Sequence, residues 1–232
     1  MSAALPWLPQ GTVYGALLNF RREWDLWAPQ MTQAPYKAAP QAPVLYIKTA
    51  NTFAPCGAAI AVPDEVDVGA TLGLVIGGFE EKLPPALAES AQAATKKEAG
   101  GLHRIAGCVL LNDLSRPHAS YYRPPIKFRN RDGFLGCGPV LQAVPDLSTL
   151  ALELRINGTL AQRIELSTLV RDAATLLRDV SEFMTLQPGD VLMLGTDCLP
   201  DGTRLRAKAG DRIEISAPDF APLVNTLVED AA

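Results

Sequence analysis

The residues best placed to do chemistry lie in one stretch of the chain, from Ala106 to Pro139. An apolar run there, CVLL, predicts a buried strand that ends in Asn112 and Asp113. A carboxylate at the mouth of a buried strand is held rigidly and stays accessible, which suits a metal ligand or a catalytic group. The loop that follows carries Arg116, Arg123, Lys127, Arg129 and Arg131. This basic loop could close over an anionic substrate; the alternative is a solvated loop beside an aspartate that only hydrogen-bonds its own turn.

The composition excludes several classes of protein. Of the 232 residues 48% are apolar and 20% are charged, and the net charge is −4, which argues against a nucleic-acid-binding protein. The apolar runs are strand-sized and broken by Gly, Pro or charge, so no membrane span is expected. The N-terminus lacks the features of a signal peptide, and the four cysteines are far apart. We therefore expect free thiols and a cytoplasmic location.

The elements that must position the basic loop are mostly short strands. We expect them at residues 12–18, 44–48, 58–62, 70–77, 108–111, 191–194 and 212–215. Two alternating segments, 149–156 and 159–165, flank Asn157-Gly158 and predict a hairpin.

Helices are expected to be few. The prolines between Pro29 and Pro63 rule out long helices in that stretch. One helix is predicted between Pro84 and Gly100, and another from a cap at Ser167 to about Met184. The pattern indicates a β-rich α+β fold, with residues 1–65 as N-terminal strands and a Pro-rich segment that pack on a main domain of residues 66–232.

Several motifs of the chain resemble the fumarylacetoacetate hydrolase family and follow the family's order. They are GTVYG at 11–15 with Asn19, Lys48, VDVGATLGLVIGG at 66–78, AGCVLLNDLS at 106–115, RNRDGFLGCGP at 129–139, the Asn157-Gly158 hairpin, FMTLQPGD at 183–190 and Gly195-Thr196. The resemblance implies a fumarylacetoacetate hydrolase-like mixed β-sandwich roll with one or two sizeable helices.

The resemblance is strongest to one branch of the family, which decarboxylates and isomerises intermediates of 4-hydroxyphenylacetate (homoprotocatechuate) catabolism. It implies a 5-oxopent-3-ene-1,2,5-tricarboxylate decarboxylase and 2-hydroxyhepta-2,4-diene-1,7-dioate isomerase that acts on small di- or tricarboxylates. Members of this branch are often fused duplications of the family domain, and the ATLGLVIGG motif resembles their N-terminal half. We therefore expect a homodimer or a hetero-oligomer with a homologous sister subunit.

The family resemblance also implies a metal site. Family members hold Mg²⁺ or Mn²⁺ with the Asp of an Asn-Asp pair and with a Glu-Xaa-Glu on a strand. Asp113 matches the first ligand, but the Glu-Xaa-Glu positions are Gly69 and Thr71. Asp67 shares a strand face with Gly69 but lies about 6.6 Å further along, too far to replace a ligand at 2.1–2.5 Å. We expect a degenerate metal site, with Asp113 as a vestigial ligand.

Other family positions are also changed. Glu23 and Leu26 stand where the family's His and Glu pair is expected, and Arg129 replaces the active-site Lys. Arginine stays protonated and cannot exchange a proton as lysine does, although it can bind a carboxylate. The expected substrate-binding residues are Asn112, Lys127, Arg129, Arg131 and Thr196. His118 is expected at the surface.

Three functions stay open at this point. The chain is a weakly catalytic or non-catalytic half that works with a complete sister subunit, an independently active diverged decarboxylase or hydrolase, or a module that binds a dicarboxylate without chemistry. The missing carboxylates and the missing His and Glu pair favour the first.

Overall fold

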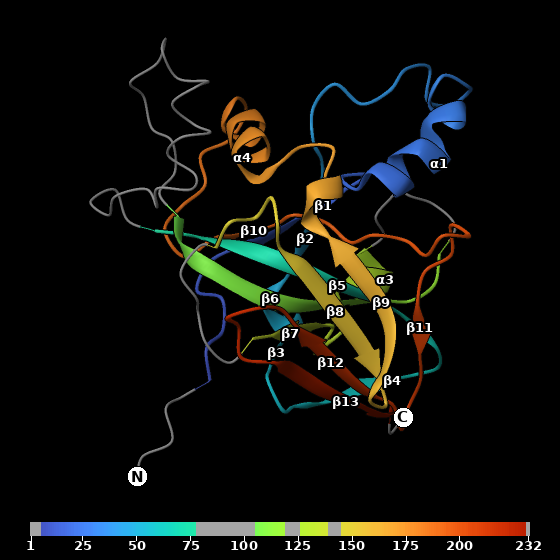
Figure 1. The fold of residues 1–232 in the computed structure, drawn as a ribbon, viewed down its shortest axis with the longest axis vertical. Helices are drawn as coiled ribbons and strands as arrows, with labels where there is room; N and C mark the ends of the chain where they lie inside the picture. Colours follow the sequence, from blue (N-terminus) through green and yellow to red (C-terminus); the bar gives the residue numbers. More distant parts are fainter. Residues whose placement is uncertain (1–5, 78–104, 119–125, 139–144, 231–232) are drawn as a thin grey trace.

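The computed structural model describes residues 6–77, 105–118, 126–138 and 145–230, and two β-sheets dominate it (Figure 1). In spatial order the larger sheet contains β2 (Val44–Lys48), β1 (Val13–Leu17), β10 (Val191–Met193), β5 (Val66–Ile76), β6 (Ile105–Ser115), β7 (Leu135–Cys137) and β3 (Phe53–Pro55), and β11 (Arg206–Ala207) pairs with β5. The smaller sheet contains β4 (Ala59–Val62), β13 (Leu223–Glu229), β12 (Arg212–Ser216), β8 (Ala151–Ile156) and β9 (Thr159–Glu165).

The main hydrophobic core lies between the two sheets. Leu72 and Leu74 of β5, Leu152 of β8 and Ile213 of β12 belong to it, and each is at most 1% exposed. Burying one such side chain contributes roughly 1.5–3 kcal/mol, so the facing sheets stabilise each other. This arrangement confirms the predicted β-rich α+β fold and its sandwich-like packing.

The helices are short. They are α1 (Arg21–Met31), α3 (Ile126–Arg129) and α4 (Ala173–Ser181), and single 3₁₀ turns span Ala50–Thr52 and Leu166–Thr168. Helix α1 ends two residues after Pro29, so the Pro-rich stretch stops a helix that the sequence did not predict. The helix expected between Pro84 and Gly100 lies outside the described residues.

Helix α4 begins later than predicted. Its N-cap is Asp172, whose carboxylate accepts a hydrogen bond from the backbone N–H of Thr175, and Ser167 lies in the preceding 3₁₀ turn. The intervening chain is extended because its backbone pairs elsewhere: the N–H groups of Val170 and Arg171 donate to the backbone and side-chain oxygens of Asn19. A tertiary contact thus overrides the helical periodicity.

The hairpin of the smaller sheet is confirmed. Asn157 and Gly158 both have positive φ, at 52° and 81°, as a two-residue type I′ turn requires. Strand β13 is not among the predicted strands. It pairs antiparallel with the preceding strand, β12, and in parallel with the sequence-distant β4.

The N-terminal strands share a sheet with the rest of the chain. Strand β1 pairs in parallel with β10 and antiparallel with β2. The proposed division at residue 65 stays a prediction.

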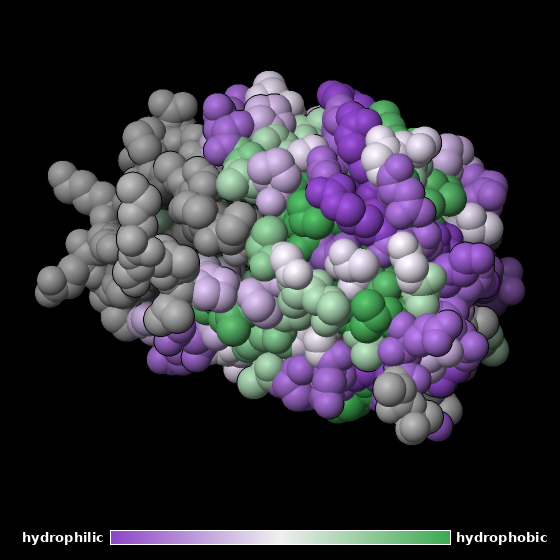
Figure 2. All heavy atoms as spheres, turned by 90° about the horizontal axis from the view of Figure 1, so that it is seen from below, coloured by the Kyte–Doolittle hydropathy of each residue, from purple (hydrophilic) through white to green (hydrophobic). Residues whose placement is uncertain are grey.

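Figure 2 shows hydrophilic side chains over much of one face of the described chain, with apolar side chains between them. Exposed large apolar residues include Ile126, Leu160 and Phe183, and such side chains do not by themselves identify a partner surface. Among the described helices, none has the length and apolar character needed to cross a membrane. All four cysteines are free thiols, and Cys108 is buried as expected.

Candidate functional site

The candidate site is built on two long neighbouring strands, β5 and β6. Gly69 lies directly opposite Asp113 in their antiparallel register, so both positions face the same side of the sheet. Strand β6 continues to Ser115, which corrects the expectation that Asp113 lies at the mouth of a strand. The strand is longer because β7 pairs with it at this level, with Leu135 opposite Asp113.

Two side chains of β2 reach Asp113 from across the sheet. Tyr46 Oη donates a hydrogen bond to Asp113 Oδ2, and Lys48 Nζ lies 2.8 Å from Asp113 Oδ1. Strands β1, β10 and β5 lie between β2 and β6, which in a flat sheet would place the outer two about 19 Å apart. The sheet therefore curls. Gly15 of β1 permits this, because a Cβ there would overlap the Tyr46 ring.

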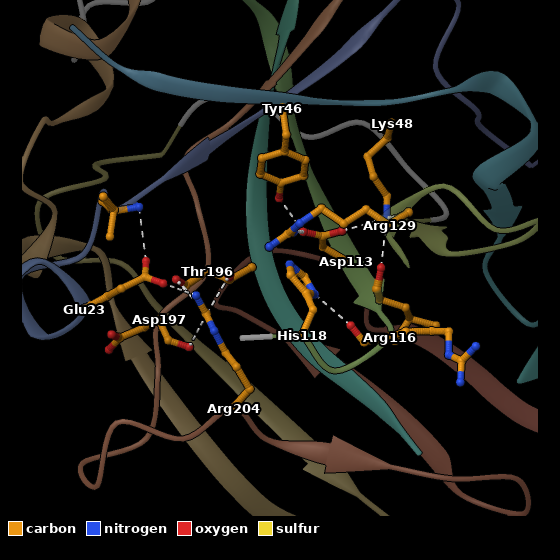
Figure 3. A network of polar contacts seen from close by, with 12 residues as sticks. Glu23, Tyr46, Lys48, Asp113, Arg116, His118, Arg129, Thr196, Asp197 and Arg204 are labelled. Carbon is orange, nitrogen blue, oxygen red and sulfur yellow. Dashed lines mark hydrogen bonds and ion pairs between the residues drawn. The ribbon is translucent and has the colours of Figure 1, made fainter. Parts of the chain in front are cut away.

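Arg129, at the end of α3, completes the group. Its Nη1 lies 3.4 Å from Asp113 Oδ2, and its guanidinium carbon is 4.3 Å from the centroid of the Tyr46 ring. Lys48 also donates to the backbone carbonyls of Leu114 and Arg129, at 2.9 and 2.6 Å (Figure 3). We call Tyr46, Lys48, Asp113 and Arg129 the Asp113 cluster.

The protonation states in the Asp113 cluster follow from burial and charge. Burial acts to raise the pKa of Asp113, but the nearby Lys48 and Arg129 outweigh it, and the pKa is lowered. Burial lowers the pKa of Lys48, and the Asp113 carboxylate opposes that shift. Burial and the same carboxylate raise the pKa of Tyr46 well above its usual value, so the phenol stays protonated and donates its hydrogen bond.

A second group of charges lies across the site. Arg204 pairs with Glu23 of α1, and its Nη1 donates to Thr196 Oγ1 at 2.8 Å. Glu23 also accepts a hydrogen bond from the backbone N–H of Leu18 at 3.2 Å. Beside them, Arg22 pairs with Asp197 at 2.9 Å. We call Arg22, Glu23, Thr196, Asp197 and Arg204 the Glu23 cluster; Figure 3 labels all of them except Arg22. Glu23, which stands at the family's His position, is here an ion-pair partner.

A hollow of about 380 Å³, including its open mouth, separates the two clusters. It is lined by Asp67, Val68, Gly69, Asp113, Ser115, His118, Arg129, Thr196 and Arg204. That volume includes open solvent, and charged side chains dominate the lining. The structure thus brings together Asp113, Arg129 and Thr196 of the predicted site residues, with Gly69 beside them.

The other predicted residues lie away from the hollow. Lys127 is exposed on α3. In an extended segment Lys127 and Arg129 would lie on the same side, but residues 126–129 are helical, so the two side chains point in different directions. Arg131 pairs with Asp230 at 2.6 Å. Asn112 is fully buried and, by strand alternation, faces the opposite side of β6 from Asp113. Thr71 is 1% exposed and is not part of the lining.

The sequence reading missed four residues at or near the hollow: Tyr46, Asp67 as a lining residue, His118 and Arg204. Tyr46 and Lys48 are two apart on β2, so alternation could have placed them together. Arg204 lies eight residues after Thr196, which ends the last motif, but no sequence motif marks Arg204 itself. His118 lines the hollow and is half-buried, which corrects its predicted surface position.

The residues around Asp113 do not fit a divalent cation. Mg²⁺ and Mn²⁺ need several oxygen ligands, whereas Gly69 opposite Asp113 carries none and a Cβ there would overlap Thr196. In the part of the chain that the structure describes, no three His, Cys, Asp or Glu side chains gather to hold a metal. A dication about 4 Å from one ammonium or guanidinium would meet roughly 8 kcal/mol of repulsion at an effective dielectric near 20.

Comparisons with known proteins agree with this fold. The family model described as fumarylacetoacetate (FAA) hydrolase C-terminal matches residues 12–228. The 4-hydroxyphenylacetate degradation bifunctional isomerase/decarboxylase of Escherichia coli is 38% identical over 224 residues, which are 95% of this chain and 48% of that protein. The chain therefore spans about half the length of the isomerase/decarboxylase relatives that it matches.

Solved structures give the same result. The 5-carboxymethyl-2-hydroxymuconate delta-isomerase of Mycobacterium smegmatis superposes with a TM-score of 0.71 at 25% identity, covering 95% of this chain and 80% of that one. Maleylpyruvate hydrolase of Sphingobium sp. SYK-6, solved with manganese(II) and pyruvate, superposes with a TM-score of 0.66 at 21% identity, covering 97% and 72%. This chain belongs to the fumarylacetoacetate hydrolase family.

Proposed function

We propose that this chain is one of two family units of an isomerase/decarboxylase of 4-hydroxyphenylacetate catabolism, and that its own site works without a metal. The match to half the length of the Escherichia coli relative supports the role as one unit of a pair. The assembly would act as a 5-oxopent-3-ene-1,2,5-tricarboxylate decarboxylase and a 2-hydroxyhepta-2,4-diene-1,7-dioate isomerase. Its other unit would be a homologous sister subunit with a complete set of carboxylates.

One observation carries the proposal: the Asp113 carboxylate is already neutralised from within the chain. Lys48 and Arg129 both reach it, and Tyr46 donates a hydrogen bond to it. In metal-assisted decarboxylation a dication stabilises the enolate left when CO₂ departs. Because Lys48 and Arg129 stand beside Asp113 where the dication would bind, this chain depends on the sister unit for stabilisation of that enolate.

The metal part of the proposal is tested by calorimetric titration of the purified chain with Mn²⁺. We expect no tight one-site binding, and no difference between the wild type and Asp113→Asn. That variant keeps the shape of the side chain but replaces one acceptor oxygen with a donor, so circular dichroism checks its fold. Tight binding that Asp113→Asn abolishes would overturn the metal-free site and favour an independently active enzyme.

The pairing part is tested by co-expression with a sister subunit that carries the Glu-Xaa-Glu and Asn-Asp motifs. The complex should decarboxylate its substrate, and Asp113→Asn in this chain should leave that activity within about twofold. The equivalent change in the sister should reduce it by several orders of magnitude. Decarboxylation by this chain alone at an ordinary rate of roughly 1–10³ s⁻¹ would contradict the proposal.

A further inference from the structure

The Asp113 side of the hollow keeps a positive charge although no metal fits it. On the Asp113 side one carboxylate faces two cations, Lys48 and Arg129, which leaves one positive charge in excess. Arg129 is 7% exposed, and its Nε has no hydrogen-bond acceptor among the residues that the structure describes. A buried guanidinium N–H without an acceptor is costly, and a carboxylate ligand would satisfy it through a charge-assisted hydrogen bond. The Arg129 side of the hollow therefore suits an anionic ligand, whereas Asp67 is a carboxylate elsewhere in the lining.

His118 is held at the same hollow, and its Nε2 has no hydrogen-bond partner among the described residues. Its Nδ1 lies 2.8 Å from the backbone carbonyl of Arg116, which can only accept, so Nδ1 carries the proton and Nε2 has the lone pair in the neutral ring. The imidazole also stacks on Phe128, with ring centroids 5.6 Å apart and planes 23° apart. Figure 3 shows the ring between the Arg116 carbonyl and the Asp113 cluster. Both contacts fix the orientation that a proton carrier needs.

We propose that the hollow is a metal-independent proton-transfer site for 2-oxo carboxylates and their enols. Arg129 binds the carboxylate next to the oxo group, and His118 Nε2 carries the proton. The inference rests on the proposed function in one respect, that no metal occupies this site. It assigns to this unit the isomerisation, which moves a proton and needs no electron sink for a departing CO₂.

The reaction balances within the substrate. In a 2-hydroxy-2,4-dienoate, Nε2 of His118 takes the proton of the enol oxygen, and the oxygen's electron pair forms the C2=O bond. The C2=C3 pair moves to C3=C4, and the C4=C5 pair takes the proton from the imidazolium at C5. The product is the 2-oxo-3-enoate, His118 is neutral again, and no co-reactant is used. Arg129 stabilises the negative charge that passes through the C2 oxygen.

Asp67 is the competing base at this hollow. Burial raises the pKa of its carboxyl, opposed by the nearby Arg206, whose Nε lies 3.5 Å from Asp67 Oδ1. Its position on β5 opposite Ser115 places it toward the outer end of the strand pair. We favour His118 because two contacts orient its free nitrogen, and the experiment includes both residues.

The test uses the purified chain in D₂O with EDTA, and 2-oxopentanedioate as the probe. Proton NMR follows exchange of the C3 protons, which passes through the analogous 2-enol and needs a base beside it. We expect wild-type exchange well above the buffer rate and unaffected by EDTA. His118→Gln should lower the turnover rate by about 10²-fold or more with little change in KM, in the range of general acid–base catalysis.

Matched variants separate catalysis from structure. Arg129→Gln should raise KM, and Arg131→Gln, whose arginine pairs with Asp230 away from the hollow, should change nothing. Added imidazole should restore exchange in His118→Gly but not in Arg129→Gln. Asp67→Asn should retain most of the activity, and circular dichroism confirms the fold of each variant.

Different failures have different meanings. Exchange that is no faster than buffer, that survives His118→Gln, or that depends on Asp67 overturns this inference and leaves the pairing of subunits intact. Exchange that EDTA abolishes and Mn²⁺ restores overturns the metal-free site as well, and the proposed function falls with it.

Discussion

The Asp113 cluster and the Glu23 cluster face each other across one hollow, but they pair their carboxylates with cations in different ratios. In the Glu23 cluster each carboxylate has a partner guanidinium: Glu23 pairs with Arg204, and Asp197 pairs with Arg22. In the Asp113 cluster two cations share one carboxylate, and a donor of Arg129 has no acceptor in the described chain. The balanced cluster holds α1 and the loop after β10 together, whereas the unbalanced one keeps the capacity to bind an anion.

The largest effect on the difference between the two clusters is expected from Asp113→Ala. It leaves Lys48 and Arg129 buried without a counter-charge, and removing one partner of a buried ion pair costs about 3–5 kcal/mol. Urea denaturation should show a loss of that size in the free energy of unfolding.

A double variant, Lys48→Met with Asp113→Leu, serves as the control because it removes opposite charges together. It should recover part of the loss, since replacing a buried ion pair by apolar side chains is often neutral or stabilising. A double variant less stable than Asp113→Ala would mean that charge balance does not govern this cluster.

The close packing of β5 against Thr196 of the Glu23 cluster is tested by Gly69→Ala. The new Cβ would overlap Thr196 Cγ2 and lie 3.0 Å from Thr196 Cβ, so we expect a loss of about 1–3 kcal/mol from overpacking. Thermal unfolding should show that Thr196→Ser, which removes Cγ2, reduces the penalty when combined with Gly69→Ala. Additive losses in the double variant would show that the two residues do not compete for space.

The smallest effect is expected from Glu23→Gln. Arg204 and the N–H of Leu18 donate to different oxygens of Glu23, and the amide has only one oxygen, so the variant loses the charge and one acceptor. We expect a loss of about 1–2 kcal/mol in the free energy of unfolding, because one buried donor is left without its acceptor. A loss as large as that of Asp113→Ala would remove the distinction between the clusters.

Local signals in the sequence predicted some elements well. Asn157-Gly158 specifies its turn because both residues tolerate positive φ, and the flanking alternation sets the strand pair. The helix before Met184 was predicted in kind but not in extent, because Asn19 binds the backbone of residues 170–171. Strand β13 was missed because a buried polar residue, Asn225, interrupts its apolar alternation, and its partner β4 lies far away in the chain.

The residues of the candidate site were also predicted only in part. Asp113, Arg129 and Thr196 were found because short motifs carry them, and Gly69 marks a missing carboxylate at a position that the strand period predicts. Lys127 and Arg131 were chosen for their charge within the same loop, but charge does not indicate in which direction a side chain points. Lys127 is exposed on α3, and Arg131 pairs with Asp230.

By itself, the sequence determined the β-rich fold, the family and the absence of carboxylates at positions 69 and 71, because composition, periodicity and motifs are local properties. Only the tertiary structure decided what replaces them. The curl of the sheet brings Tyr46 and Lys48 from β2 onto Asp113 of β6, across three intervening strands. Because that contact depends on how far a whole sheet bends, no stretch of residues around position 48 or 113 encodes it.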